Sequence, residues 1–485
     1  MSRLFARPFH LNLNLNQLGL ICLVIGLGIV LTWLPLKLAF GLTGAAAILV
    51  LNLLHPKLAL YLLIPAIPFN TLFQVSLGGI SLGPMEALLG LLLLTWLLQM
   101  ATRQTIIVPQ APLLWPFLIF LGAISLSWLT AFSLKASLIE TLKWVEMLAL
   151  YLFITANFSG KESRRLILLL ILVGIAQAGL GLYQFLFKAG PAGFLLFGGR
   201  FLRAFGTFRQ PNPYGGYLGL ILPLALSVAL WGGERLLSGR PKLRTDLGLI
   251  TVAWGGFGLM LAALFASQSR GAWLAFMMAL IVTLFLKGGQ WAVALTGVSI
   301  ALATLISMGA LALLPETISQ RFVDALPFVN RPDIVTVELT DANFAILERL
   351  AHWQAAEYIW RDNFWLGVGF GNYESVYQAY AIGRWLDPLG HAHNYILNIG
   401  AETGLIGLIG YLIFWGWVIG YTIRGWLKTA PDSLNRAILA GTIGILTHLH
   451  FHNLLDNLYV QGMYLHITIL LGLITLTIGG DTNDQ

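Results

Sequence analysis

The chain has few charged residues and only one cysteine. Charged side chains make up 10% of its 485 residues, whereas an ordinary soluble domain carries roughly 25%. The chain therefore lacks the polar surface of a water-soluble protein of this length, and it also lacks the charge of a disordered segment or a coiled coil. Because Cys22 is the single cysteine, the sequence excludes an intrachain disulfide and a cysteine-based metal site.

In place of charge, the sequence has hydrophobic residues, which make up 58% of the chain and give a mean hydropathy of +0.80. Apolar runs of about 20 residues, enough to cross a hydrocarbon core of roughly 30 Å, recur along its length. They predict an all-α polytopic membrane protein with about 12–14 transmembrane helices. The predicted spans lie near residues 17–34, 37–54, 58–75, 84–101, 113–130, 137–156, 166–187, 213–231, 247–266, 272–287, 291–314, 395–423, 437–456 and 460–478.

The longest stretch without a predicted span, 315–390, separates an N-terminal bundle (1–314) from a C-terminal one (391–485). It predicts one helix over 341–361, with Asp341 as its N-cap. If the N-terminus lies inside, inside loops hold fifteen Lys and Arg and short outside loops hold seven, which favours that orientation and an extracytoplasmic 315–390 segment. The net charge of +7 thus reports orientation among membrane lipids and predicts no nucleic-acid partner.

The first polar cluster lies in a stretch rich in Gly, Pro and Asn just before a predicted span, and contains Arg203, Arg209 and Asn212. Such a stretch leaves backbone amides free of helical bonds, and guanidinium groups bind phosphate bidentately without losing their charge. These three residues are predicted to bind an anion. The alternative is a cationic anchor that contacts lipid headgroups.

The second cluster is the short turn 267–272, which holds Ser269 and Arg270 between two apolar runs. An arginine in so short a turn is costly unless it faces protein or water. Hydroxyl groups beside an arginine and a glycine suit the binding of an oxyanion, although a headgroup contact remains the alternative.

The third cluster joins the 315–390 segment to the next span, with His393 and Asn394 followed by Gly404 and Gly407. The spacing predicts His393 on one helical face with Leu397 and Gly400, and the two later glycines predict close approach of a neighbouring helix. Histidine is the natural proton acceptor near neutral pH. A helix cap or a packing role is the alternative.

The fourth cluster contains His448, His452 and Asp456, which recur every four residues and are predicted to share one helical face. Three interpretations remain open for them: an interfacial hydrogen-bond network, a metal site suggested by the His spacing, or direct contact with a substrate.

Together, the motifs around Arg203, Arg270 and His393 resemble the O-antigen ligase superfamily, which includes O-antigen ligases, polysaccharide polymerases and bacterial O-linked oligosaccharyltransferases. The resemblance covers roughly residues 165–460, by the order of the motifs, their spacing and the long segment before the histidine.

The resemblance implies a GT-C-like membrane glycosyltransferase in the bacterial inner (cytoplasmic) membrane, working on the periplasmic face. It implies a donor glycan on an undecaprenyl-diphosphate carrier and a metal-independent reaction without a cofactor. His393 matches the family's proposed general base, and Arg203 and Arg270 match arginines that hold the donor diphosphate. The other predicted substrate-binding residues are Arg209, Asn212, Ser269, Asn394, His452 and Asp456.

The chemistry of the sequence is consistent with these expectations. It contains no Asp-x-Asp element, so arginines are the available cations for a leaving diphosphate. Attack by an acceptor hydroxyl opposite to the diphosphate predicts inversion at the anomeric carbon. The acceptor, whether a lipid A core, another glycan or a protein, stays open. The alternative function is a membrane transporter of a small anion, like relatives described as inorganic-carbon transporters.

Overall fold

The computed structural model describes most of residues 57–480, with gaps at 78–79, 105–110, 197–198, 239–242, 298–333 and 340–342, breaks at 56, 292 and 295–296, and scattered residues between 43 and 55. Residues 1–59 and residues 60–485 form separate compact units. The predicted span 17–34, most of 37–54 and 291–314, and Asp341 lie outside the described residues.

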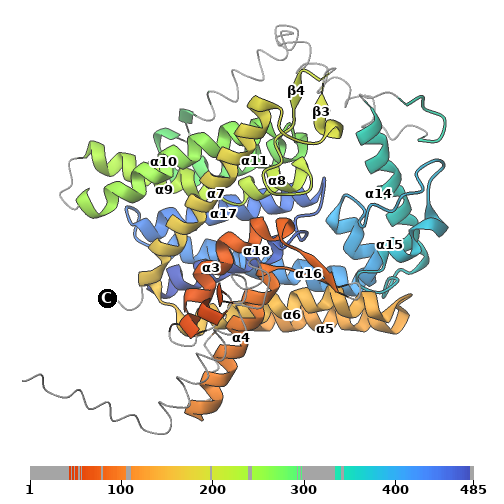
Figure 1. Ribbon diagram of the computed structural model, residues 1–485, viewed down its shortest axis with the longest axis horizontal. Helices are drawn as coiled ribbons and strands as arrows, with labels where there is room; N and C mark the ends of the chain where they lie inside the picture. The colour runs from red at the N-terminus through yellow and green to blue at the C-terminus, as the bar shows by residue number, and fades with distance from the viewer. Residues whose placement is uncertain are drawn as a thin grey trace, which may run out of the picture. The chain divides into compact units, whose positions relative to one another are not determined.

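The described part of the chain is almost entirely helical (Figure 1). Two short antiparallel hairpins, β1–β2 (Val75–Leu77, Ile80–Leu82) and β3–β4 (Leu195–Leu196, Phe201–Leu202), are the strands found there. The longer helices are α3 (Lys57–Phe69), α4 (Pro84–Arg103), α5 (Leu114–Leu126), α6 (Leu134–Asn157), α7 (Ser163–Phe187), α8 (Pro211–Gly219), α9 (Leu222–Leu237), α10 (Leu243–Ala266), α11 (Arg270–Lys287), α14 (Phe344–Asp362), α16 (Tyr395–Lys428), α17 (Leu434–Asn453) and α18 (Met463–Gly480), and α15 is a single turn (Tyr373–Val376).

Seven helical stretches of the described residues are long and apolar enough to cross a membrane: α4, α7, α8 with α9, α10, α11, α16 and α18. The prediction of an all-α polytopic membrane protein is therefore confirmed. Most predicted spans coincide with helices, but the span predicted at 213–231 is two helices, because the chain leaves the helical path between Gly219 and Leu222.

Helix starts follow the local sequence. Pro84 occupies the first turn of α4, where its missing N–H costs nothing, and the Glu86 carboxylate accepts the Gly83 N–H at 2.8 Å. Ser133 and Ser433 cap α6 and α17, each accepting the backbone N–H of the third residue of its helix. These caps fix where the helices begin and where the loops between them lie.

Helix α17 is central to the packing of residues 60–485, because it contacts α9, α11, α16 and α18. Glycine makes this closeness possible at α8, since a Cβ on Gly219 would lie 2.0 Å from the His448 imidazole. His448 is thus buried against a neighbouring helix.

Helix α16 is broken at Gly404, whose φ of +63° is left-handed. The carbonyls of Phe364 and Trp365 accept the N–H groups of Leu405 (2.8 Å) and Ile406 (3.3 Å) there. The backbone that approaches Gly404 therefore belongs to the segment after α14, not to the neighbouring helix predicted from the two glycines. These backbone hydrogen bonds hold the end of α14 beside α16 (Figure 1).

Candidate functional site

His391 and His393 lie in a turn directly before α16. His393 has a left-handed φ of 51°, and its N–H donates to Nδ1 of His391 at 3.1 Å, while its carbonyl accepts the Trp353 indole N–H at 3.2 Å. Asn394 is the N-cap of α16 and accepts two backbone N–H groups. The prediction that His393 lies on the helix face is therefore wrong, because the cap at Asn394 starts the helix after it.

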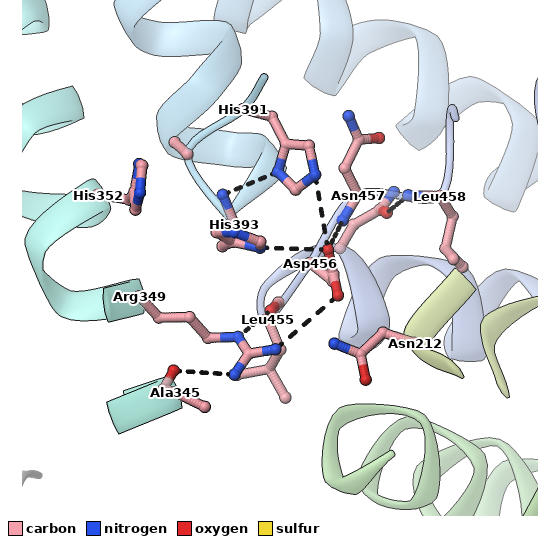
Figure 2. A network of polar contacts seen from close by, with 12 residues as sticks. Asn212, Ala345, Arg349, His352, His391, His393, Leu455, Asp456, Asn457 and Leu458 are labelled. Carbon is pink, nitrogen blue, oxygen red and sulfur yellow. Dashed lines mark hydrogen bonds and ion pairs between the residues drawn. The ribbon is translucent and has the colours of Figure 1, made fainter. Parts of the chain in front are cut away.

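Asp456 belongs to the loop between α17 and α18 and lies beside this turn (Figure 2). Its Oδ1 is 3.4 Å from Nδ1 of His393 and 3.8 Å from Nε2 of His391, and it accepts the N–H of Asn457 at 2.9 Å. The predicted common face with His448 and His452 is wrong for Asp456, since α17 ends at Asn453.

The charges around Asp456 set the protonation of this cluster. Burial by itself raises the pKa of the Asp456 carboxyl, but the hydrogen bond with His393 and the charges of His391, His393 and Arg349 together hold that pKa well below its usual value. Burial lowers the pKa of His391 to about 4, against the pull of Asp456, and also lowers the pKa of His352 to about 4. An ionised carboxylate thus faces the neutral imidazole of His391 at neutral pH.

The hydrogen bonds also indicate which ring nitrogen of His393 is free. Nδ1 faces the Asp456 carboxylate, which can only accept, so Nδ1 carries the proton of the neutral ring. Nε2 is buried and has no hydrogen-bond partner among the described residues. The arrangement leaves a lone pair on Nε2, in the state that a general base requires.

His391, His393 and Asp456 place three potential metal ligands within 4.8 Å of one another. The bond from the His393 N–H leaves Nδ1 of His391 unprotonated, so Nε2 of the neutral His391 ring carries a proton and faces Asp456. A metal at Nε2 requires this proton to move and the His393 N–H bond to break. The donor set as arranged favours a hydrogen-bonded cluster.

Hydrogen bonds hold Arg203, of the first cluster, against the second cluster. Arg203 donates from Nε to the Ser267 carbonyl at 3.0 Å and from Nη2 to Asn212 Oδ1 at 2.8 Å. Ser269 is the N-cap residue of α11, so Arg270 is the first residue of that helix. The structure thereby brings together Arg203, Asn212, Ser269 and Arg270.

Close contacts at glycines join these residues to the loop of Asp456. A Cβ on Gly215 would lie 3.1 Å from Ser267 Oγ, and one on Gly216 would lie 3.3 Å from the buried His452 ring. A Cβ on Gly271 would lie 3.5 Å from the Leu455 Cβ. Both arginine motifs therefore pack against the end of α17 and the loop that carries Asp456.

Arg209 is the predicted site residue whose contacts lie elsewhere. Its exposed guanidinium donates to Gln74 Oε1 at 2.8 Å, and its backbone N–H donates to Gln461. No described contact links it to Asp456.

Three residues near Asp456 were not among the predicted site residues: Arg349, His352 and His391. Arg349 Nη2 lies 4.0 Å from Asp456 Oδ2, and His352 packs edge-on against His393 with ring centroids 5.6 Å apart. His391 stands two residues before His393, and this spacing was the available signal for it. Arg349 and His352 belong to α14, and nothing in their local sequence separates them from an ordinary solvated face.

Residues 255–412 match the family model of the O-antigen ligase domain. The matched region contains Arg270 and His393, whereas Arg203 precedes it and Asp456 follows it. No curated protein matches the chain. This match, together with the helical fold and the motifs described above, supports the O-antigen ligase superfamily over residues 255–412.

Proposed function

We propose that the protein is a glycosyltransferase that moves a glycan from undecaprenyl diphosphate to an acceptor hydroxyl on the periplasmic face of the bacterial inner membrane. The observation that supports this most directly is the His393–Asp456 pair, with a free imidazole Nε2, joined by packing contacts to the turns of Arg203 and Arg270. A proton acceptor beside fixed cations is what transfer from a lipid diphosphate needs.

In the proposed reaction, Nε2 of His393 takes the proton of the acceptor hydroxyl as its oxygen attacks the anomeric carbon. The bond between that carbon and the phosphate oxygen breaks, and its electron pair leaves with the diphosphate. Asp456 holds the His393 ring by Nδ1 and stabilises the imidazolium that forms. Arg203 and Arg270 stabilise the charge on the departing diphosphate.

Attack from the side opposite to the diphosphate inverts the anomeric carbon. The new linkage is then expected to have the opposite anomeric configuration from the donor, which NMR of the product measures. Retention of configuration would contradict the single-displacement step.

The decisive test is transfer by purified protein in lipid nanodiscs. The donor is an undecaprenyl-diphosphate-linked glycan, and the acceptors are a lipid A core, a second glycan and a hydroxyl-bearing peptide. We expect transfer to one acceptor class, with loss of activity in His393→Ala and Arg270→Ala at unchanged protein abundance. His55→Ala, which changes an exposed histidine that the proposed mechanism does not use, is the matched control. Full transfer by His393→Ala would exclude its role as base.

The proposed face is tested by labelling of single cysteines. In a Cys22→Ala background, Glu374→Cys, in the segment between α14 and α16, is expected to react with an impermeant maleimide added to spheroplasts. Lys428→Cys, at the end of α16, is expected to react only after lysis. Both positions are exposed. The reverse pattern would contradict the proposed orientation.

A further inference from the structure

Arg349 is an arginine that the structure orients without using most of its donors. Its Nε donates to the Leu455 carbonyl at 3.2 Å and its Nη1 donates to the Ala345 carbonyl at 3.0 Å. The nearest charge, Asp456 Oδ2, is 4.0 Å from Nη2, which is too long for a hydrogen bond. Of the five guanidinium N–H groups, three therefore have no described protein acceptor within bonding distance.

This geometry differs from that of an arginine whose only role is to join α14 to the loop between α17 and α18 by an ion pair. A clamp between guanidinium and carboxylate usually forms two parallel bonds of about 2.7–2.9 Å. Here two neutral carbonyls hold the guanidinium plane, and the side chain is still 25% exposed. The free edge, with Nη2, remains able to bind another anion.

Arg349 lies beside Leu455 and Asp456 (Figure 2), and this loop connects it to the two arginine motifs. Leu455, whose carbonyl it binds, packs against Gly271, the residue after Arg270. In Figure 2, the Asn212 side chain, which binds Arg203, and the Arg349 guanidinium both lie below Asp456, Asn212 to the right and Arg349 to the left. Arg349, on α14, therefore contacts the same loop that the two arginine motifs contact from the membrane helices.

We propose that Arg349 binds a phosphate oxygen of the lipid-diphosphate donor, so that helix α14 supplies a third arginine to the diphosphate site. This inference rests on the proposed function. Departure of the glycan adds a negative charge to the diphosphate, and the unused N–H groups of Arg349 supply donors for it without rearrangement of the loop.

The test measures binding directly, with farnesyl diphosphate as the probe and the full-length protein in nanodiscs. We expect Arg349→Gln to bind the probe at least tenfold more weakly than wild type, because a charge-assisted hydrogen bond is lost. Arg349→Lys, which keeps the charge but loses the fork, is expected to lie between the two. The matched control, Arg361→Gln, changes an arginine of the same helix that stacks on Tyr358 and is expected to bind as wild type does.

A second measurement needs no variant. Phenylglyoxal modification of Arg349 in the wild-type protein, read by peptide mass spectrometry, is expected to decrease when farnesyl diphosphate is present. Equal affinity of Arg349→Gln and wild type, or absence of protection, would overturn the role of Arg349 alone. Failure of the wild-type protein to bind farnesyl or undecaprenyl diphosphate would instead contradict the proposed donor.

Discussion

Replacing Asp456 by Asn removes one negative charge and nearly preserves the shape of the side chain. Asp456 Oδ1 lies 3.4 Å from His393 Nδ1, longer than an ordinary N–H···O bond of about 2.7–3.2 Å. Bonds to charged groups contribute about 1.5–3 kcal/mol, and this length favours the lower half of that range. A loss of about 2 kcal/mol corresponds to a kcat lowered about thirtyfold.

The assay is the transfer reaction with saturating donor and acceptor, so that kcat is read apart from KM. Because the pKa of Asp456 lies well below its usual value, wild type keeps the carboxylate ionised throughout the assay range and the variant lacks that charge at every pH tested. The control is Asp362→Asn on α14, whose carboxylate accepts only the Tyr380 hydroxyl among its described hydrogen bonds. Its kcat is expected to match wild type.

A double-mutant cycle separates positioning of the base from a general loss of structure. If Asp456 acts through His393, then Asp456→Asn lowers kcat in the wild-type background and has little further effect in His393→Ala. Equal effects in both backgrounds, or a kcat of Asp456→Asn within threefold of wild type, would refute the reasoning. Thermal unfolding of each variant identifies losses due to instability.

Three further outcomes are expected. Gly219→Ala places a Cβ 2.0 Å from the His448 ring and should destabilise the protein by about 1–3 kcal/mol, seen as a lower Tm, whereas Gly179→Ala, with open space around it, should not. In the folded protein, the pKa values of His352 and His391 are about 4, below the ordinary 6.5, so between pH 4 and pH 6.5 the unfolded chain binds more protons than the folded one. The free energy of unfolding should therefore fall as the pH drops from about 6.5 to about 4, by up to about 3 kcal/mol for each histidine. A Tm that rises on acidification would contradict this. EDTA should leave transfer unchanged, since arginines stabilise the leaving group, and a clear loss that added metal restores would show a metal requirement.

Helix positions were predictable because they depend on local signals. Hydropathy predicted a span at 166–187 and another at 272–287, and the structure has α7 at Ser163–Phe187 and α11 at Arg270–Lys287. The break in α16 was not predictable, because a glycine in an apolar run has many uses. Its left-handed φ is fixed by the Phe364 and Trp365 carbonyls, which come from a distant segment.

The candidate site was predictable residue by residue but not as an arrangement. His393 and Asp456 stood out separately as ionisable groups at the ends of apolar runs, yet their contact spans 63 positions of sequence. The four-residue spacing predicted Asp456 on the same helix as His448 and His452, because such a spacing does not indicate where α17 ends. Arg349 carried no local signal, since its significance comes from the Leu455 carbonyl and the Asp456 carboxylate that it meets across the fold.

The two oxygens of Asp456 connect the proposed base to the proposed cation site. Oδ1 faces His393 and His391, while Oδ2 faces Arg349. Removing the Arg349 charge therefore changes the field at the carboxylate that holds His393, and a lower kcat in an Arg349 variant is expected whether or not the arginine touches the donor. For this reason kcat alone cannot assign Arg349 to the diphosphate, and the affinity for farnesyl diphosphate, to which His393 as a proton acceptor contributes little, is the quantity that separates the two roles.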